Sequence, residues 1–226
     1  MRKRVDLELN SGGSSTLGNF NGLKVFFIFL SAVTTTSILI AGTVTTDANE
    51  PTINSGDIAL FSGNTQQDLI WTDRPNPGQT FLSGAEGGLL NSFSVKLGTV
   101  PGLATKTFFF RVGTVSGTSF TTLATSTGSF TVNPAAQDFL IFTFDSPVTL
   151  QPSTLYGVDF EMTGSTAHWS TGISRVARTN SSQYPDGSKY TKVDGDPVSV
   201  SLSGSHDLIF HVDIDIPAKG TFFVIQ

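Results

Sequence analysis

The amino-acid sequence predicts an all-β protein: an antiparallel β-sandwich with jelly-roll-like connectivity, and little helix apart from a signal-like segment near the N-terminus. Three observations predict this fold class. Phenylalanine is abundant, with 19 residues among 226, and Gly is frequent, which favours pleated strands and tight turns over helices. Short apolar runs alternate with Gly, Pro, Asn and Ser beyond Glu50. In several runs apolar residues occupy every second position, the period of a strand with one buried face.

Residues 1–48 are interpreted as a polar spacer followed by a signal-peptide-like apolar segment. The chain opens with MRKR, and after Lys24 the apolar run VFFIFLSAVTTTSILIAG covers residues 25–42. A basic start, an apolar stretch and a small-residue exit are typical of a secretory signal, with Thr46 and Ala48 as the cleavage pair. The alternatives are a buried strand and an uncleaved membrane anchor, although TTTS interrupts the run of about 20 apolar residues that a spanning helix needs. We therefore expect a protein that is secreted or held at the cell surface.

Residues 49–216 are predicted to form a single β-sandwich domain, with strands that follow from the alternation. Strands are expected at NSFSVKLG, TLYGVDFEM and DLIFHVDIDIP. The side chains predicted to face inward are Phe93, Val95, Leu97, Tyr156, Val158, Phe160, Met162, Leu208, Phe210, Val212, Ile214 and Ile216. Residues 106–113 (KTFFFRVG) and 138–145 (DFLIFTFD) are apolar on both faces for part of their length, as in strands covered on both sides. Phe108, Phe110 and Phe142 therefore mark the predicted core.

Composition and charge exclude several classes of partner and site. The chain has no cysteine and a formal net charge of −5. The absence of cysteine excludes disulfides, thiolate nucleophiles and cysteine-type zinc sites. Lys and Arg are scattered and form no basic stripe, so no nucleic-acid partner is expected. The negative charge disfavours anionic lipid surfaces, which leaves an uncleaved N-terminal segment as the expected route to a membrane.

Catalytic motifs are absent from the sequence, and we expect no enzyme. The chain has no HExxH, GxSxG, Walker loop or GxGxxG pattern. His211, Asp213 and Asp215 share one predicted strand face and could form a metal cluster, but a solvated face of a terminal strand is favoured. Glu161 beside Asp159 could imitate the carboxylate pair of a glycosidase. No second wall of a cleft is indicated for that pair.

The segment SSQYPDGSKYTKVDGDPVSV, residues 181–200, combines aromatic and acidic residues with turn signals. Pro-Asp-Gly at residues 185–187 predicts a tight turn. Exposed aromatic rings beside polar groups are typical of sugar-binding sites. The candidate sugar-stacking residues and polar partners are Trp169, Tyr184, Tyr190, Arg175 and Asp186, with Trp71 as a further aromatic candidate. The alternative is that each aromatic belongs to the core or rim of the sandwich.

A structural calcium ion is a weaker candidate in the same segment. Asp194 and Asp196 flank a glycine, and Ca²⁺ requires six to eight oxygen ligands. Backbone carbonyls and another carboxylate would have to complete the set. No other cofactor is expected.

The order of several segments resembles a group of secreted bacterial β-sandwich domains, the choice-of-anchor and PEP-CTERM-associated type. The matching segments are PGQTFLSGAEGGLLNSFSVKLG, TFFFRVG, FLIFTFDSPVTLQPSTLYGVDFEM, HWSTG, YPDGSKY and DLIFHVDI, which together cover about residues 78–216. The resemblance implies a β-sandwich fold, export and an interchangeable C-terminal anchor, and it leaves the molecular activity open. The tail DIPAKGTFFVIQ resembles the opening of a PEP-CTERM sorting tail, but Pro217 is followed by Ala218 and Lys219 in place of Glu and Pro. Residues 217–226 are therefore predicted to be a degenerate anchor or a last strand.

Together these observations predict a non-catalytic exported protein of the cell surface or extracellular matrix, with a structural, adhesive or assembly role. A carbohydrate-binding module that uses the aromatics between residues 169 and 190 is the alternative. A glycoside-active enzyme is the least favoured of the three hypotheses. The expected partners are extracellular polysaccharide or further copies of the chain.

Overall fold

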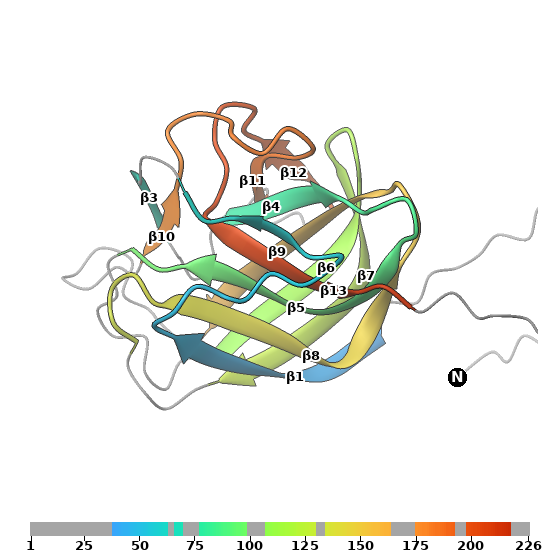
Figure 1. Ribbon diagram of the computed structural model, residues 1–226, viewed down its shortest axis with the longest axis horizontal. Coiled ribbons are helices and arrows are strands. Elements are labelled where there is room, and N and C mark those ends of the chain that lie inside the picture. Colours follow the sequence, from blue (N-terminus) through green and yellow to red (C-terminus); the bar gives the residue numbers. More distant parts are fainter. Residues whose placement is uncertain are drawn as a thin grey trace, which may run out of the picture. The chain divides into compact units, whose positions relative to one another are not determined.

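The computed structural model describes residues 38–62, 66–69, 77–98, 107–129, 134–163, 175–192 and 198–217 (Figure 1). These residues form strands and connecting turns, and none of them is helical. The strands are β1 (Ile38–Asp47), β2 (Ile58–Leu60), β3 (Gln66–Leu69), β4 (Pro77–Leu82), β5 (Gly88–Lys96), β6 (Thr107–Ser116), β7 (Ser119–Ser129), β8 (Phe139–Leu150), β9 (Leu155–Thr163), β10 (Arg175–Arg178), β11 (Lys189–Lys192), β12 (Val200–Leu202) and β13 (Phe210–Asp215). The all-β prediction is confirmed.

Eleven of these strands follow one another in a single hydrogen-bonded order, β12-β11-β4-β9-β6-β7-β1-β8-β5-β13-β2. The order folds back on itself at β1 and so makes two layers. Sheet A contains β12, β11, β4, β9, β6, β7 and the first part of β1, and sheet B contains the second part of β1, β8, β5, β13 and β2. Neighbouring strands are antiparallel except β1 and β7, which are parallel. In Figure 1 the sheet B strands β8, β5 and β13 cross in front of the β6–β7 hairpin.

The chain crosses between the layers several times, as expected for jelly-roll-like connectivity. It passes from β4 in sheet A to β5 in sheet B, returns to β6 and β7 in sheet A, and then enters β8 in sheet B and β9 in sheet A. Strands β10 and β3 form a separate antiparallel pair. The predicted antiparallel β-sandwich is therefore confirmed.

Strand β1 joins the two sheets and lies before the predicted domain boundary at residue 49. Its residues 38–41 pair with residues 124–127 of β7, and its residues 42–47 pair with residues 139–144 of β8. At the change of partner, a Cβ atom on Gly42 would lie 2.5 Å from Cζ of Phe110 and 2.7 Å from the carbonyl oxygen of Thr143. Glycine is therefore required at this corner. The predicted boundary is too late in the chain, because β1 is an integral part of the sandwich.

The position of β1 also corrects the predicted cleavage site. Removal of the chain up to Ala48 would remove β1 and expose the edges of β7 and β8, so a cleavage site that preserves this fold lies before Ile38. Residues 1–37 lie outside the described residues, and export stays a prediction. Within the described residues, no helix has the length and apolar character of a membrane span. The tail prediction for residues 218–226 also lies outside the described residues.

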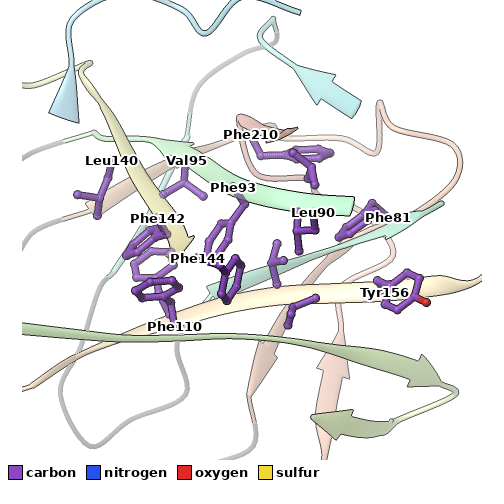
Figure 2. Packing of buried hydrophobic residues seen from close by; sticks show 14 of the residues in the cluster. Phe81, Leu90, Phe93, Val95, Phe110, Leu140, Phe142, Phe144, Tyr156 and Phe210 are labelled. Carbon is purple, nitrogen blue, oxygen red and sulfur yellow. The ribbon is translucent and has the colours of Figure 1, made fainter. Parts of the chain in front are cut away.

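Phenylalanine side chains from both sheets fill the space between the layers. Phe142 of β8 stacks on Phe93 of β5 at 4.7 Å and on Phe160 of β9 at 4.8 Å between ring centroids. It also contacts Phe108 at 5.7 Å and Phe110 at 5.2 Å. Figure 2 shows the Phe93, Phe110 and Phe142 rings gathered between the strands. All five rings are buried, which confirms the predicted core.

The outward face is covered where β13 begins, contrary to the prediction, whereas Asp215 at its end is exposed as predicted. Ile209 and His211 are buried on this face, and Ile209 packs with Phe139 and Ala177 in a second apolar cluster. The cover comes from β10, because the Ile209 N–H donates to the Ala177 carbonyl at 3.1 Å. Ile216, predicted to face inward, is instead exposed. Period-2 alternation identifies the two faces of a strand but not whether another element packs over the second one.

We predict that Phe142→Ala lowers the free energy of unfolding by about 3–5 kcal/mol, because it leaves a cavity among four aromatic rings. Urea denaturation of the full chain measures this loss. Phe109→Ala is the matched control, since Phe109 is 44% exposed on the opposite face of sheet A. This variant should cost no more than about 1 kcal/mol. Equal losses for the two variants would contradict the assignment of the core.

Candidate functional site

A depression of about 220 Å³ lies on the outer face of sheet A, the face turned away from the phenylalanine core. We call it the sheet A depression. It is lined by Phe109, Phe110 and Arg111 of β6, Thr122 and Thr125 of β7, Asp159 and Glu161 of β9, and Lys192 of β11. Exposed Phe109 and the polar side chains of four strands therefore meet at one place on the sheet.

Strand register explains why these side chains meet. Tyr190 of β11 is opposite Gly78 of β4, and Gly78 is opposite Asp159 of β9. Asp159 is in turn opposite Arg111 of β6, and Arg111 is opposite Thr125 of β7. Directly opposed residues project from the same face of a sheet. These five residues therefore form one transverse row, which we call the Arg111 row.

The carboxylate of Asp159 is a buried charge that Arg111 neutralises and the Tyr190 hydroxyl hydrogen-bonds. Arg111 Nε lies 2.7 Å from Oδ1 and 2.8 Å from Oδ2 of Asp159, and the Tyr190 hydroxyl donates to Oδ2 at 2.7 Å. An unpaired carboxylate at this depth would cost several kcal/mol, whereas a paired and hydrogen-bonded one is tolerated. Both oxygens of Asp159 are therefore committed to internal donors.

Arg111 is held from two sides. Burial alone would lower the pKa of its guanidinium, but the charge and hydrogen bonds of Asp159 raise that pKa above its ordinary value, so Arg111 stays charged. The guanidinium also lies over the ring of Phe120, 4.1 Å from its centroid, which is a cation–π contact. The guanidinium of Arg111 therefore lies between the Asp159 carboxylate and the Phe120 ring at the sheet A depression.

Gly78 leaves the space through which Tyr190 reaches Asp159. The Tyr190 ring covers this glycine, and a Cβ atom on residue 78 would lie 2.3 Å from Cζ of Tyr190. Any side chain at residue 78 would displace the ring and break the hydrogen bond to Asp159. The glycine of the PGQTF segment is thus required by the Arg111 row.

A second transverse row lies beside the first. Phe109 of β6 is opposite Glu161 of β9 and Thr127 of β7. Glu161 forms an ion pair with Lys192 of β11 through its Oε2 atom. The aromatic ring of Phe109 therefore stands among hydrogen-bond donors and acceptors, with two cationic and two anionic side chains in the lining.

Tyr190 was predicted to stack on a sugar, and this prediction is wrong. Its side chain is completely buried and its hydroxyl is bound to Asp159. The sequence could not decide between the two positions, because an aromatic residue in a short strand after a turn can either stay exposed for a ligand or cover a neighbouring glycine.

Of the other predicted sugar-site residues, the structure describes Tyr184, Asp186 and Arg175, and none of these three lines the sheet A depression. Tyr184 is half-buried, packs edge-on against Phe210 at 5.5 Å between centroids, and accepts a hydrogen bond from the Leu82 N–H at 3.3 Å. Asp186 is exposed in the predicted turn, and Arg175 is exposed at the start of β10. Trp71, Trp169 and the calcium candidates Asp194 and Asp196 lie outside the described residues.

His211, Asp213 and Asp215, for which a solvated face was favoured over a metal cluster, lie on β13, and His211 serves the fold. His211 Nε2 lies 3.1 Å from Oδ2 of Asp57, and Oδ1 of Asp57 accepts the Ile214 N–H at 2.9 Å. Burial alone would raise the pKa of Asp57, but hydrogen bonds from the Asn54 and Ile214 N–H groups and from His211 lower it below its ordinary value. Within the described residues, no group of three His, Asp or Glu side chains is placed to hold a metal. Strand β13 lies between β5 and β2, so the predicted terminal position is wrong.

Sequence reasoning missed Asp207 and Gln79, which hold residues 183 and 184 beside β4. Buried Asp207 accepts hydrogen bonds from the Gln183 N–H at 2.7 Å, the Tyr184 N–H at 2.9 Å and Gln79 Nε2 at 3.2 Å. Gln79 Oε1 accepts the Leu208 N–H at 2.9 Å. Gln79 lies in the segment PGQTF and Asp207 in DLIF, two of the segments that carry the family resemblance. The sequence therefore marked both residues but did not indicate their hydrogen-bonding role.

Comparison with protein-family models finds no match for this chain, and comparison with curated proteins finds no relative. The resemblance to choice-of-anchor and PEP-CTERM-associated domains therefore stays a prediction. The geometry of the sheet A depression is what bears on function.

We predict that Tyr190 makes the protein sensitive to alkali. Burial raises the pKa of Tyr190 well above its ordinary value, and the negative charge of Asp159 raises it further, partly opposed by Arg111. The folded state therefore keeps a proton that the unfolded chain loses at about pH 10. The stability due to the neutral phenol is complete below that pH and falls at higher pH by about 1.4 kcal/mol per pH unit.

Urea denaturation at a series of alkaline pH values measures this slope. Tyr190→Phe should reduce the slope of the free energy of unfolding against pH by about 1.4 kcal/mol per pH unit, the contribution of one proton. An ultraviolet absorbance titration in which Tyr190 ionises near pH 10 while the chain stays folded would contradict the prediction.

Proposed function

We propose that this chain is an exported, non-catalytic β-sandwich protein of the cell surface or extracellular matrix that acts by adhesion through the sheet A depression. The observation that carries the proposal is the Arg111 row, whose paired and hydrogen-bonded polar side chains line the sheet A depression together with exposed Phe109. A preorganised site of this kind loses little entropy when it binds. Export is supported by the order of basic and apolar residues before β1 and by the resemblance of residues 78–216.

The side chains with acid–base chemistry favour binding over catalysis. Asp159 accepts from Arg111 and Tyr190, and Glu161 is paired with Lys192. A glycosidase requires one carboxyl group that gives a proton to the substrate and another that attacks it or activates water. Carboxylates held by internal cations are poorly suited to either role, so the predicted Asp159 and Glu161 pair is better explained as part of a binding surface.

We predict that the full chain is retained on surfaces coated with extracellular polysaccharide and releases no new reducing ends from them. Phe109→Ala should reduce retention at least about tenfold, a loss of about 1.4 kcal/mol. Ile53→Ala removes an exposed apolar side chain outside the sheet A depression and is the matched control. Retention on no surface, or the release of sugar, would contradict adhesion without catalysis.

A second candidate function, assembly by strand exchange, is favoured by the position of β1. This strand completes both sheets, yet in the part whose burial is described, residues 42–47, only Val44 is buried. Residues 48–55, which lead toward β2, are exposed apart from half-buried Pro51. An identical β1 from a second copy would restore every β1 contact. The protein concentration and the linker of residues 48–55 therefore decide whether β1 binds its own chain or a second copy.

We predict that β1 can be supplied by a second copy. Thr43 and Thr143 are opposed across β1 and β8, and the chain has no cysteine of its own. When Thr43→Cys and Thr143→Cys chains are refolded together at high concentration, a short thiol cross-linker should join them into dimers. Thr114→Cys and Thr121→Cys, opposed within the β6–β7 hairpin, are the control pair and should stay unlinked. Equal cross-linking of the two pairs, or none, would count against exchange.

A further inference from the structure

The charges around the sheet A depression cancel. Arg111 is paired with Asp159, and Lys192 is paired with Glu161, while the whole chain carries a net charge of −5. An anionic ligand would approach a negative protein and meet two carboxylates beside the two cations. Electrostatic complementarity therefore disfavours an acidic ligand at this site.

The lining nevertheless offers hydrogen bonds in both directions. The Lys192 ammonium carries three donors, and Glu161 accepts from Lys192 through one of its two oxygens. The hydroxyls of Thr122 and Thr125 can each donate and accept, and both residues line the sheet A depression. Mixed donors and acceptors without net charge suit the hydroxyl groups of an uncharged ligand.

Phe109 adds an apolar platform to these polar groups. The residue is 44% exposed and has Glu161 and Thr127 as its direct cross-strand neighbours. Opposed side chains on adjacent strands lie about 5 Å apart at Cβ, which is close to the width of one pyranose ring. One face of a sugar presents C–H groups that pack on an aromatic ring, while its hydroxyls point outward to polar neighbours.

The size of the site limits the ligand to a small unit. A volume of about 220 Å³ lies below the 300–1,000 Å³ typical of sites that enclose drug-sized molecules. A depression of this size accommodates one ring, beside which Phe109 is 44% exposed.

We infer that the sheet A depression binds a single sugar unit of an uncharged polysaccharide, with the ring stacked on Phe109 and its hydroxyls bound by Lys192, Glu161 and Thr125. This inference rests on the proposed adhesive function and names its ligand class. It places carbohydrate recognition on β6, β7, β9 and the end of β11, and not on the aromatics predicted between residues 169 and 190.

The test measures retention of the full chain on uncharged polysaccharides, such as cellulose, mannan and β-1,3-glucan, and on acidic alginate and polygalacturonate. Each surface is tested at low and high salt. We expect retention on at least one uncharged polysaccharide, unchanged by salt, and little retention on the acidic ones. Thr125→Val, which replaces a hydroxyl by a methyl group of the same shape, should weaken retention several-fold.

Thr121→Val is the matched control, because Thr121 is an exposed β7 residue outside the sheet A depression, and it should bind like the parent. Urea denaturation establishes that both variants are folded. Retention on acidic polysaccharide alone, abolished by salt, would overturn the inference while leaving adhesion in place. Retention on uncharged polysaccharide that is insensitive to Phe109→Ala and Thr125→Val would also overturn it. Retention on none of the surfaces would overturn the proposed function together with the inference.

Discussion

The carboxylate of Asp159 is a buried charge that sheet A must neutralise on its own outer face. Arg111 is directly opposed to Asp159 in the β6–β9 pairing and forms an ion pair with it. Tyr190 lies on the other side, opposed to Asp159 across Gly78, and its hydroxyl donates a third short contact. Removing Arg111 would leave the Asp159 carboxylate without a compensating charge at low dielectric. Removing the Tyr190 hydroxyl would take away one of its hydrogen bonds. The constraint fixes the register of β11 on β4 and of β9 on β6, and it builds the floor of the sheet A depression as a consequence.

The two faces of sheet A therefore depend on different physical forces. The inner face is held by burial of aromatic rings around Phe142, which supplies stability in a chain without disulfides. On the outer face, the directional contacts of the Arg111 row contribute geometry more than net free energy. They lie beside a small apolar cluster made by Val115, Phe120, Tyr190 and Val200. Strand β1 links both sheets at Gly42, so the aromatic layer is closed along one side by a strand from the beginning of the described chain.

The inner face was predictable from the sequence, because Phe142, Phe160 and their neighbours recur with the period of a strand. The outer face was not predictable, since alternation identifies a second face without showing what packs on it. The burial of Tyr190 was missed for that reason. Residues 38–42 were assigned to a signal segment because an apolar run has the same composition in a signal and in a strand. Arg111 could have been found earlier, as a single cation within an apolar strand requires a buried partner.

The most direct test of the role of Asp159 is a comparison of Tyr190→Phe in two backgrounds. In the parent chain, the loss of the hydrogen bond to the carboxylate should lower the free energy of unfolding by about 1.5–3 kcal/mol. In an Arg111→Met/Asp159→Leu background the acceptor is already absent, so the same change should be close to neutral. Urea denaturation of the four proteins gives both values. The same loss in the two backgrounds would show that Tyr190 acts through packing alone and would contradict the account.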